Sequence, residues 1–261
     1  MAGDTDTHTV ALPGGTRMPL IGLGTWLLNG HRGYEAILTA LELGYRHIDT
    51  ATMYRNEAEV GRAISDSRVP REQIFITTKL PPHHAGRERD TILASLRALG
   101  TDYVDLWLIH WPPHGASPRT WREFIAVRNA GLARSIGVSN YTLSQLDELQ
   151  DATGETPAVN QIRWSPSLYD PLVLAGHRER GVVLEGYSPF KNTDLADPRL
   201  VKIAAQHRVS PAQVVVRWHV QHGIVVIPKS ARPERLSANI DVYGFSLSHQ
   251  VIADIDALAR P

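Results

Sequence analysis

The chain has 261 residues, 43% of them hydrophobic and 21% charged, which is typical of a globular protein large enough to bury a substantial core. Lys plus Arg and Asp plus Glu both number 27, so no net field favours binding to nucleic acid or to an anionic membrane. The absence of cysteine excludes disulfides, thiolate zinc ligands and cysteine nucleophiles.

The N-terminus, MAGDTDTHTV, lacks the basic and apolar regions of a signal peptide, and no apolar run approaches the ~20 residues of a membrane span. We therefore expect a cytoplasmic protein that binds neither membrane nor nucleic acid. Residues 1–8 are expected to form a loose tail. Residues 9–12 and 16–18 flank a Pro-Gly-Gly turn and predict a β-hairpin.

Beyond the hairpin, short apolar runs alternate with longer amphipathic stretches. Strands are predicted at residues 20–23, 45–48, 74–77, 104–109, 135–138, 158–161, 182–185 and 224–227. Helices are predicted at residues 34–43, 57–64, 89–99, 120–129, 142–151, 169–179, 198–207, 210–221, 233–239 and 249–259, with Thr142 and Ser210 as N-caps.

This alternation of strands and helices has the count and length of a (β/α)8 TIM barrel. We expect a single domain over residues 1–261, with the N-terminal hairpin as a cap and an extra helix at the C-terminus. A doubly wound open sheet is the alternative, because it produces the same alternation.

In such a barrel, functional side chains collect on the loops that follow the C-terminal ends of the strands. Polar or aromatic groups stand at nearly every one of these ends: Thr25 and Trp26, Asp49, Lys79, His110, Ser139 and Asn140, Gln161, Tyr187 and Ser188, and Lys229 and Ser230. Each has a structural explanation by itself, such as a helix cap, a core aromatic or a surface lysine. Their convergence on one face of a barrel predicts a functional site there.

Four of the residues near these ends form a coherent set for acid catalysis: Asp49, Tyr54, Lys79 and His110. A free tyrosine titrates near ~10 and is a poor proton donor at neutral pH, but a neighbouring ammonium favours the phenolate and lowers the pKa. Lys79 would supply that ammonium, and Asp49 its counter-charge. With His110 orienting a carbonyl beside the Tyr54 hydroxyl, the set is suited to protonating an alkoxide as it forms.

The chain resembles the aldo-keto reductase family in motifs that follow the family's order and spacing over almost its whole length. They are GYRHIDTATMYRNE (44–57), TTKL around Lys79, LIHWP (108–112), IGVSN (136–140), VNQ (159–161), GYSP (186–189) and IPKSARPERLSANI (227–240). The resemblance is closest to small microbial reductases of aldehydes and diketones. It implies a monomeric, metal-independent enzyme that uses NADPH to reduce carbonyls to alcohols. In it, Tyr54 would be the proton donor, Lys79 and Asp49 its charge partners, and His110 the substrate-orienting residue.

The resemblance also implies the residues that bind the cofactor and the substrate. Ser139, Asn140 and Gln161 match the groups that hold the nicotinamide carboxamide, and Tyr187 matches the residue stacked on its ring. Lys229, Ser230 and Arg235 match the pocket for the 2′-phosphate, Asn239 an adenine contact, and Thr25 and Ser188 further cofactor positions; Trp26, Met53 and Trp111 match the substrate pocket. Two cations and a hydroxyl suit a phosphate dianion, which favours NADPH over NADH.

Two other functions are compatible with the same fold. One is a regulatory or structural protein that binds NADPH without turnover, and the other is an isomerase or hydrolase using Asp49 and His110 as acid and base. Two local signals are weak: the glycines at 22 and 24 lack the third glycine of a dinucleotide-binding loop, and His219 and His222 lack a third zinc ligand. Arg163, two residues after Gln161, has no explanation from the sequence.

Overall fold

The computed structural model describes residues 8–259, so the expected tail at 1–8 lies outside the described residues except for His8. Its main sheet has eight parallel strands that follow one another in chain order. They are β3 (Leu23–Gly24), β4 (His47–Asp49), β5 (Phe75–Leu80), β6 (Val104–Ile109), β7 (Ala133–Ser139), β8 (Val159–Arg163), β9 (Val183–Tyr187) and β10 (Val225–Val226). All eight predicted strands are present, with ends that shift by a few residues.

The sheet closes on itself between its first and last strands. Ile21 forms a parallel bridge with Val226. The amide of Gly22 donates to the Val226 carbonyl at 2.9 Å, and the Val226 amide donates to the Leu20 carbonyl at 2.8 Å. This closure confirms the barrel and excludes the open, doubly wound sheet.

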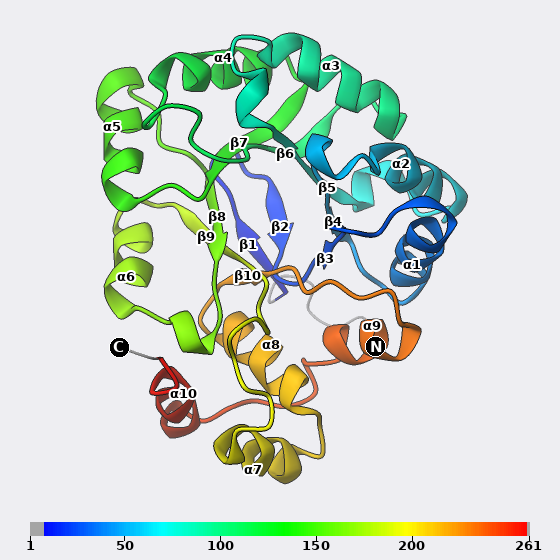
Figure 1. The fold of residues 1–261 in the computed structure, drawn as a ribbon, viewed down its shortest axis with the longest axis vertical. Coiled ribbons are helices and arrows are strands. Elements are labelled where there is room, and N and C mark those ends of the chain that lie inside the picture. Colours follow the sequence, from blue (N-terminus) through cyan, green and yellow to red (C-terminus); the bar gives the residue numbers. More distant parts are fainter. Residues whose placement is uncertain (1–7, 260–261) are drawn as a thin grey trace.

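Helices surround the barrel (Figure 1). They are α1 (Gly30–Glu42), α2 (Glu57–Asp66), α3 (Glu88–Leu99), α4 (Pro118–Asn129), α5 (Leu143–Thr153), α6 (Pro171–Glu179), α7 (Pro198–His207), α8 (Pro211–Gln221), α9 (Pro233–Ile240) and α10 (His249–Asp256). The predicted caps are confirmed: Thr142 and Ser210 each form a capping box with the glutamine three residues later. Within residues 8–259, no helix is both long and apolar enough to cross a membrane.

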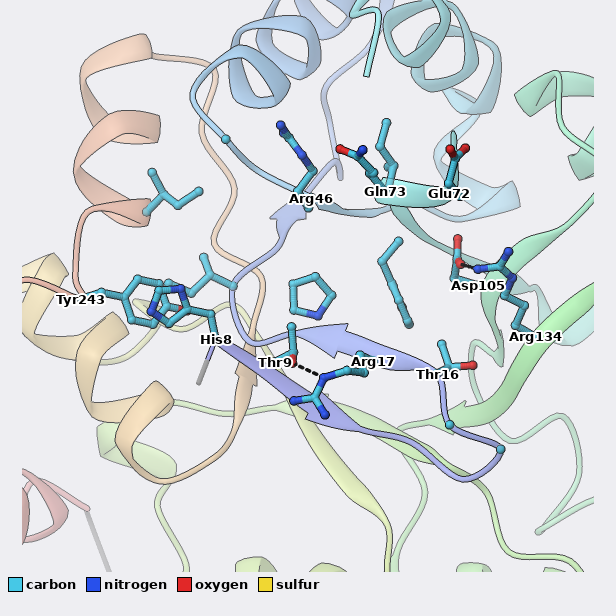
Figure 2. A pocket seen from close by; sticks show the side chains of 18 residues that line it. His8, Thr9, Thr16, Arg17, Arg46, Glu72, Gln73, Asp105, Arg134 and Tyr243 are labelled. Carbon is cyan, nitrogen blue, oxygen red and sulfur yellow. Dashed lines mark hydrogen bonds and ion pairs between the residues drawn. The ribbon is translucent and has the colours of Figure 1, made fainter. Parts of the chain in front are cut away.

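The N-terminal hairpin consists of β1 (Thr9–Ala11) and β2 (Arg17–Pro19), which pair antiparallel and lie across one end of the barrel (Figure 1). A cavity of about 940 Å³ lies between this hairpin and the segments that enter the strands (Figure 2). Its charged groups are largely engaged, since Arg134 pairs with Asp105 and Arg17 donates to Thr9. No pattern in the sequence indicates this cavity, which lies at the opposite end of the barrel from the predicted site.

The glycines at the start of the barrel are required by packing. A Cβ on Gly22 would lie 2.5 Å from Nδ1 of His47, and one on Gly24 would lie 2.8 Å from the carbonyl oxygen of Ile227. Both distances are shorter than real side chains tolerate. The two glycines therefore let the first strand approach its neighbours closely, which explains them without a dinucleotide-binding loop.

Candidate active site

A second cavity, of about 400 Å³, opens at the C-terminal ends of the strands. Most of the residues predicted for the site line it: Trp26, Asp49, Met53, Tyr54, His110, Trp111, Ser139, Asn140, Gln161, Tyr187, Ser188 and Lys229. Lys79 does not line the cavity but is completely buried and bonded to Asp49. The residues Thr25, Ser230, Arg235 and Asn239 do not line it either.

Lys79 and Asp49 form a buried ion pair at the ends of neighbouring strands β5 and β4. The ammonium donates to Oδ1 and Oδ2 of Asp49 at 2.7 and 2.8 Å and to the Thr50 carbonyl at 2.7 Å. These three bonds use every hydrogen of the ammonium in the ground state. A buried charge is tolerated only with such compensation, so Asp49 holds the Lys79 ammonium as a fixed positive charge next to the cavity.

Tyr54 lines the cavity next to this pair and lies on the short 3-10 helix Thr52–Tyr54 that follows β4. Its ring lies 5.1 Å from the Lys79 ammonium, measured from Nζ to the ring centroid. Burial raises the pKa of the Tyr54 phenol above its ordinary value, and the charge of Lys79 opposes that rise without reversing it. The expectation of a lowered pKa is therefore wrong for this structure, because the loss of hydration outweighs the ammonium.

His110 follows β6 and packs edge-on against Tyr54, with ring centroids 5.6 Å apart. Burial, reinforced by the charge of Lys79, lowers the pKa of His110 to about 3. The imidazole is therefore neutral at physiological pH and carries one N–H. A neutral ring beside a phenol can donate a hydrogen bond to an oxygen in the cavity without competing for the phenolic proton.

An amide-rich group of side chains forms the wall next to this acid. Ser139 Oγ donates to the backbone carbonyl of Gln161 at 2.8 Å, and Asn140 Nδ2 donates to Ser139 Oγ at 2.9 Å. The Tyr187 hydroxyl donates to Asn140 Oδ1 at 2.9 Å. Asn140 and Ser188 both have left-handed backbone conformations, with φ of 64° and 56°. Non-glycine residues are strained there, a feature that clusters at functional sites.

A cluster of cations follows β10, where Lys229, Arg232 and Arg235 are all exposed. In the part of the chain that the structure describes, none of the three forms an ion pair with a carboxylate. Arg232 is the N-cap residue of α9 and Arg235 lies in its first turn, where free backbone N–H groups and the helix dipole favour anions; Lys229 precedes them in the same segment. The arrangement suits a phosphate, and Ser230 lies within it, 7% exposed.

Two predicted cofactor residues lie deeper. Thr25 is fully buried, and its hydroxyl donates to the Asp49 backbone carbonyl at 2.9 Å. Asn239 lies on the inner face of α9 and is 4% exposed. Thr25 thus holds the strand end that carries Asp49, and contact of either residue with a cofactor stays a prediction.

Three large apolar side chains form the rim of the cavity. Trp26, Met53 and Trp111 are 59%, 50% and 47% exposed, respectively. Large hydrophobic groups left this open around a cavity are typical of a binding site. Their position agrees with the predicted substrate pocket.

The structure adds residues in or next to the cavity that sequence reasoning did not assign. Arg163 ends β8 and lines the cavity, where its charge acts on the Tyr187 phenol: burial raises the pKa of that phenol and Arg163 opposes the rise. Lys191 also lines the cavity. Glu185, inside β9, is fully buried next to Gln161. The sequence signal that could have identified Glu185 is an acidic residue within an otherwise apolar predicted strand.

The weak zinc signal has a structural explanation. Nδ1 of His219 donates to the Val215 carbonyl at 2.8 Å, and Nε2 of His222 donates to Asp256 at 2.9 Å. Over residues 8–259, no group of three or more histidine or acidic side chains is placed to hold a metal ion. The two histidines therefore serve packing and capping contacts around α8.

Comparison with known proteins agrees with this geometry. The sequence profile of the "Aldo/keto reductase family" matches residues 20–260. The chain is 44% identical to 2,5-diketo-D-gluconic acid reductase B of Corynebacterium sp., covering 97% of this chain and 93% of the relative. The crystal structure of an aldo/keto reductase from Brucella melitensis superposes with a TM-score of 0.92 at 40% identity, covering 96% of this chain and 98% of the other.

A further solved structure was determined with a bound nucleotide. It is a mutant of Gox0644 in complex with NADPH, with a TM-score of 0.91 at 37% identity, covering 97% of this chain and 93% of the other. Family match, sequence identity and fold all extend over nearly the full chain. The chain therefore belongs to the aldo-keto reductase family.

Proposed function

We propose that this protein is an NADPH-dependent reductase that converts aldehydes or ketones to alcohols, with Tyr54 as the general acid. One observation carries the proposal: a phenol lines the cavity within 5.1 Å of the ammonium of a buried Lys79–Asp49 pair, measured from the ring centroid. A phenol in this position can donate its proton to a ligand in the cavity, and the ammonium of Lys79 stabilises the phenolate that remains.

The residues present fit the cofactor that aldo-keto reductases use, NADPH. Gln161 lines the cavity, and its side-chain oxygen makes no hydrogen bond within residues 8–259. This oxygen is therefore available to accept from a carboxamide. The Tyr187 ring lies beside it, and the cation cluster after β10 suits the 2′-phosphate. When bound, NADPH supplies the hydride.

The chain's own residues supply orientation and the proton. Neutral His110 donates its N–H to the carbonyl oxygen of the substrate, which polarises the carbonyl and fixes it beside Tyr54. Tyr54 gives its proton to that oxygen as negative charge develops there. Lys79 stabilises the resulting phenolate, and Asp49 holds Lys79 in place.

The protonation states support this direction of transfer. Because burial raises the pKa of Tyr54, the phenol carries its proton throughout the neutral range. Burial alone would lower the pKa of Lys79, but the charge of Asp49 and its hydrogen bonds to the ammonium raise the pKa above its ordinary value, so the ammonium persists. The acid and its stabilising charge thus exist together before a substrate arrives.

The rim indicates a small substrate with an apolar part next to its carbonyl. Trp26, Met53 and Trp111 offer apolar surface, whereas Arg163 and Lys191 place positive charge on the same cavity. The Corynebacterium relative is named for a diketo acid. Aldehydes, ketones and diketones are therefore the substrates to examine first, and we expect the enzyme to be monomeric and cytoplasmic.

Tyr54→Phe tests the mechanism, because it removes only the hydroxyl. We expect NADPH binding, measured by fluorescence, to be retained and kcat for carbonyl reduction to fall by at least ~100-fold, the usual contribution of a general acid. Full turnover by this variant would contradict the role of Tyr54. Tight NADPH binding by the wild type without turnover on any carbonyl would favour the regulatory alternative, and turnover without cofactor would favour an isomerase or hydrolase.

A further inference from the structure

Glu185 is a fully buried carboxyl group that the proposed chemistry does not use. It lies inside the barrel on β9, opposite Gln161 on β8 and Val225 on β10. No lysine or arginine pairs with it among the described residues, and its one ionisable partner is His47, at 3.7 Å. A carboxyl group in this environment is costly to bury, so its presence requires a function.

Its hydrogen bond indicates what that function is. The amide nitrogen of Gln161 donates to Oε2 of Glu185 at 2.9 Å and to Oδ2 of Asp49 at 2.8 Å. A primary amide has two N–H groups, so both are used within the barrel. The amide is therefore held between two carboxyl groups that come from strands on different sides of the barrel.

This arrangement fixes which way the amide faces. If the Gln161 amide turned over, its oxygen would meet the ionised Asp49 carboxylate in place of a hydrogen-bonding contact, an electrostatically repulsive arrangement at low dielectric. Asp49 alone would satisfy one N–H and leave the other without a buried partner. Glu185 supplies the second acceptor, and the amide oxygen is left to face the cavity that Gln161 lines.

We propose that Glu185 is a positioning residue for the cofactor: with Asp49 it locks the Gln161 amide so that its oxygen accepts a hydrogen bond from the carboxamide NH₂ of the nicotinamide. This role rests on the proposed NADPH-dependent function. Glu185 would not contact the cofactor. It would affect the binding of one chemical group, the carboxamide, by holding Gln161 in place.

The protonation state of Glu185 agrees with this role. Burial, together with the nearby charge of Asp49, raises the pKa of Glu185 to about 8. At neutral pH the carboxyl group therefore keeps its proton, while Oε2 still accepts from Gln161. Oε1 has no hydrogen-bond partner within the described residues, so it can carry the proton, and the neutral His47 beside it adds no charge.

The test compares two cofactors that differ only at the carboxamide. Dissociation constants are measured for NADP⁺ and for 3-acetylpyridine adenine dinucleotide phosphate, in which an acetyl group replaces the carboxamide and no N–H remains. For Glu185→Met we expect NADP⁺ to bind roughly 10-fold more weakly, the effect of one lost hydrogen bond, with less than ~2-fold change for the acetyl analogue. Glu185→Gln keeps an acceptor oxygen and should stay within ~3-fold of the wild type for both cofactors.

Equal weakening of both cofactors by Glu185→Met would overturn the proposal, because general damage to the site does not distinguish the two. Unchanged binding of NADP⁺ would overturn it as well. If Glu185→Met does not fold, as judged by circular dichroism, Glu185→Leu provides the same comparison. Wild-type turnover with NADPH is measured in parallel, so that failure of the reductase function is seen separately from failure of this role for Glu185.

Discussion

Glu185 and Lys79 are both buried near the Asp49 carboxylate, yet one stays neutral and the other stays charged. The ammonium of Lys79 meets both oxygens of Asp49 and a backbone carbonyl, so it keeps its charge. Glu185 meets an amide and a neutral imidazole, so it keeps its proton. Lys79 and Asp49 therefore stay charged as a pair, and the Lys79 ammonium lies 5.1 Å from the centroid of the Tyr54 ring.

Protonation of Glu185 makes stability depend on pH. Its pKa is about 8 in the folded protein against 4.5 for an exposed glutamate, so between these values the folded state binds the extra proton. Stability therefore falls as pH rises through this window, by up to about 1.4 kcal/mol per pH unit. Glu185→Gln lacks the titrating group, and urea unfolding at pH 5, 6.5 and 8 should show a flatter dependence than the wild type.

A parallel pH dependence in the two proteins would contradict this assignment.

At the scale of elements, the strands are short and their ends are sharply defined. β3 and β10 have only two residues each, and their close approach depends on glycine. Gly22 makes room for the His47 ring, and Gly24 for the carbonyl of Ile227. The seam that closes the barrel is therefore made by backbone contacts and by the absence of side chains.

Gly22→Ala tests this seam. The added methyl group would meet Nδ1 of His47 at 2.5 Å, so we expect a loss of about 1–3 kcal/mol in the free energy of unfolding, the usual cost of overpacking. Gly244→Ala is the matched control, because a Cβ there meets no atom within 4 Å. Urea denaturation measures both, and equal stability of the two variants would show that the seam is not tightly packed.

At the scale of the whole molecule, closure of the barrel brings residues far apart in sequence to one cavity. Trp26 follows the first strand of the barrel and Lys229 the last, yet both line the same space. Lys229 lines this cavity and also belongs to the cation cluster after β10, so the cluster adjoins this end of the barrel. A dinucleotide bound at both places would connect the two ends of the chain, and we expect the protein to unfold as one domain.

Binding of NADPH should therefore stabilise the whole fold. A ligand present at 100 times its dissociation constant stabilises the native state by about 2.7 kcal/mol, which a rise in melting temperature measures. Arg235→Met removes a cation from the cluster, so we expect a smaller rise with NADPH and an unchanged rise with NADH, which has no 2′-phosphate. Arg97→Met, on the exposed surface of α3, should leave both shifts unchanged.

An equal loss of the NADH shift in Arg235→Met would show that Arg235 supports the fold or another part of the dinucleotide. An unchanged NADPH shift would place the 2′-phosphate elsewhere in the cluster, on Lys229 or Arg232.

The sequence by itself determined the elements and most of the cavity. Apolar runs of four to six residues bounded by turns predict strands because the period of the side chains is local, and the same is true of the capping boxes at Thr142 and Ser210. In a parallel barrel every strand presents its C-terminal end at the same face. Locating the strand ends was therefore enough to group Asp49, Tyr54 and His110.

Only the tertiary structure decided what depends on distance and burial. Gln161 and Asp49 are 112 residues apart, and no local pattern predicts that one amide joins Asp49 to Glu185. The direction of the Tyr54 pKa shift was also beyond the sequence, which identifies Lys79 as a neighbour but not how much water the fold removes. Hydration and long-range contacts are properties of the closed barrel, whereas strand and helix signals reside in neighbouring residues.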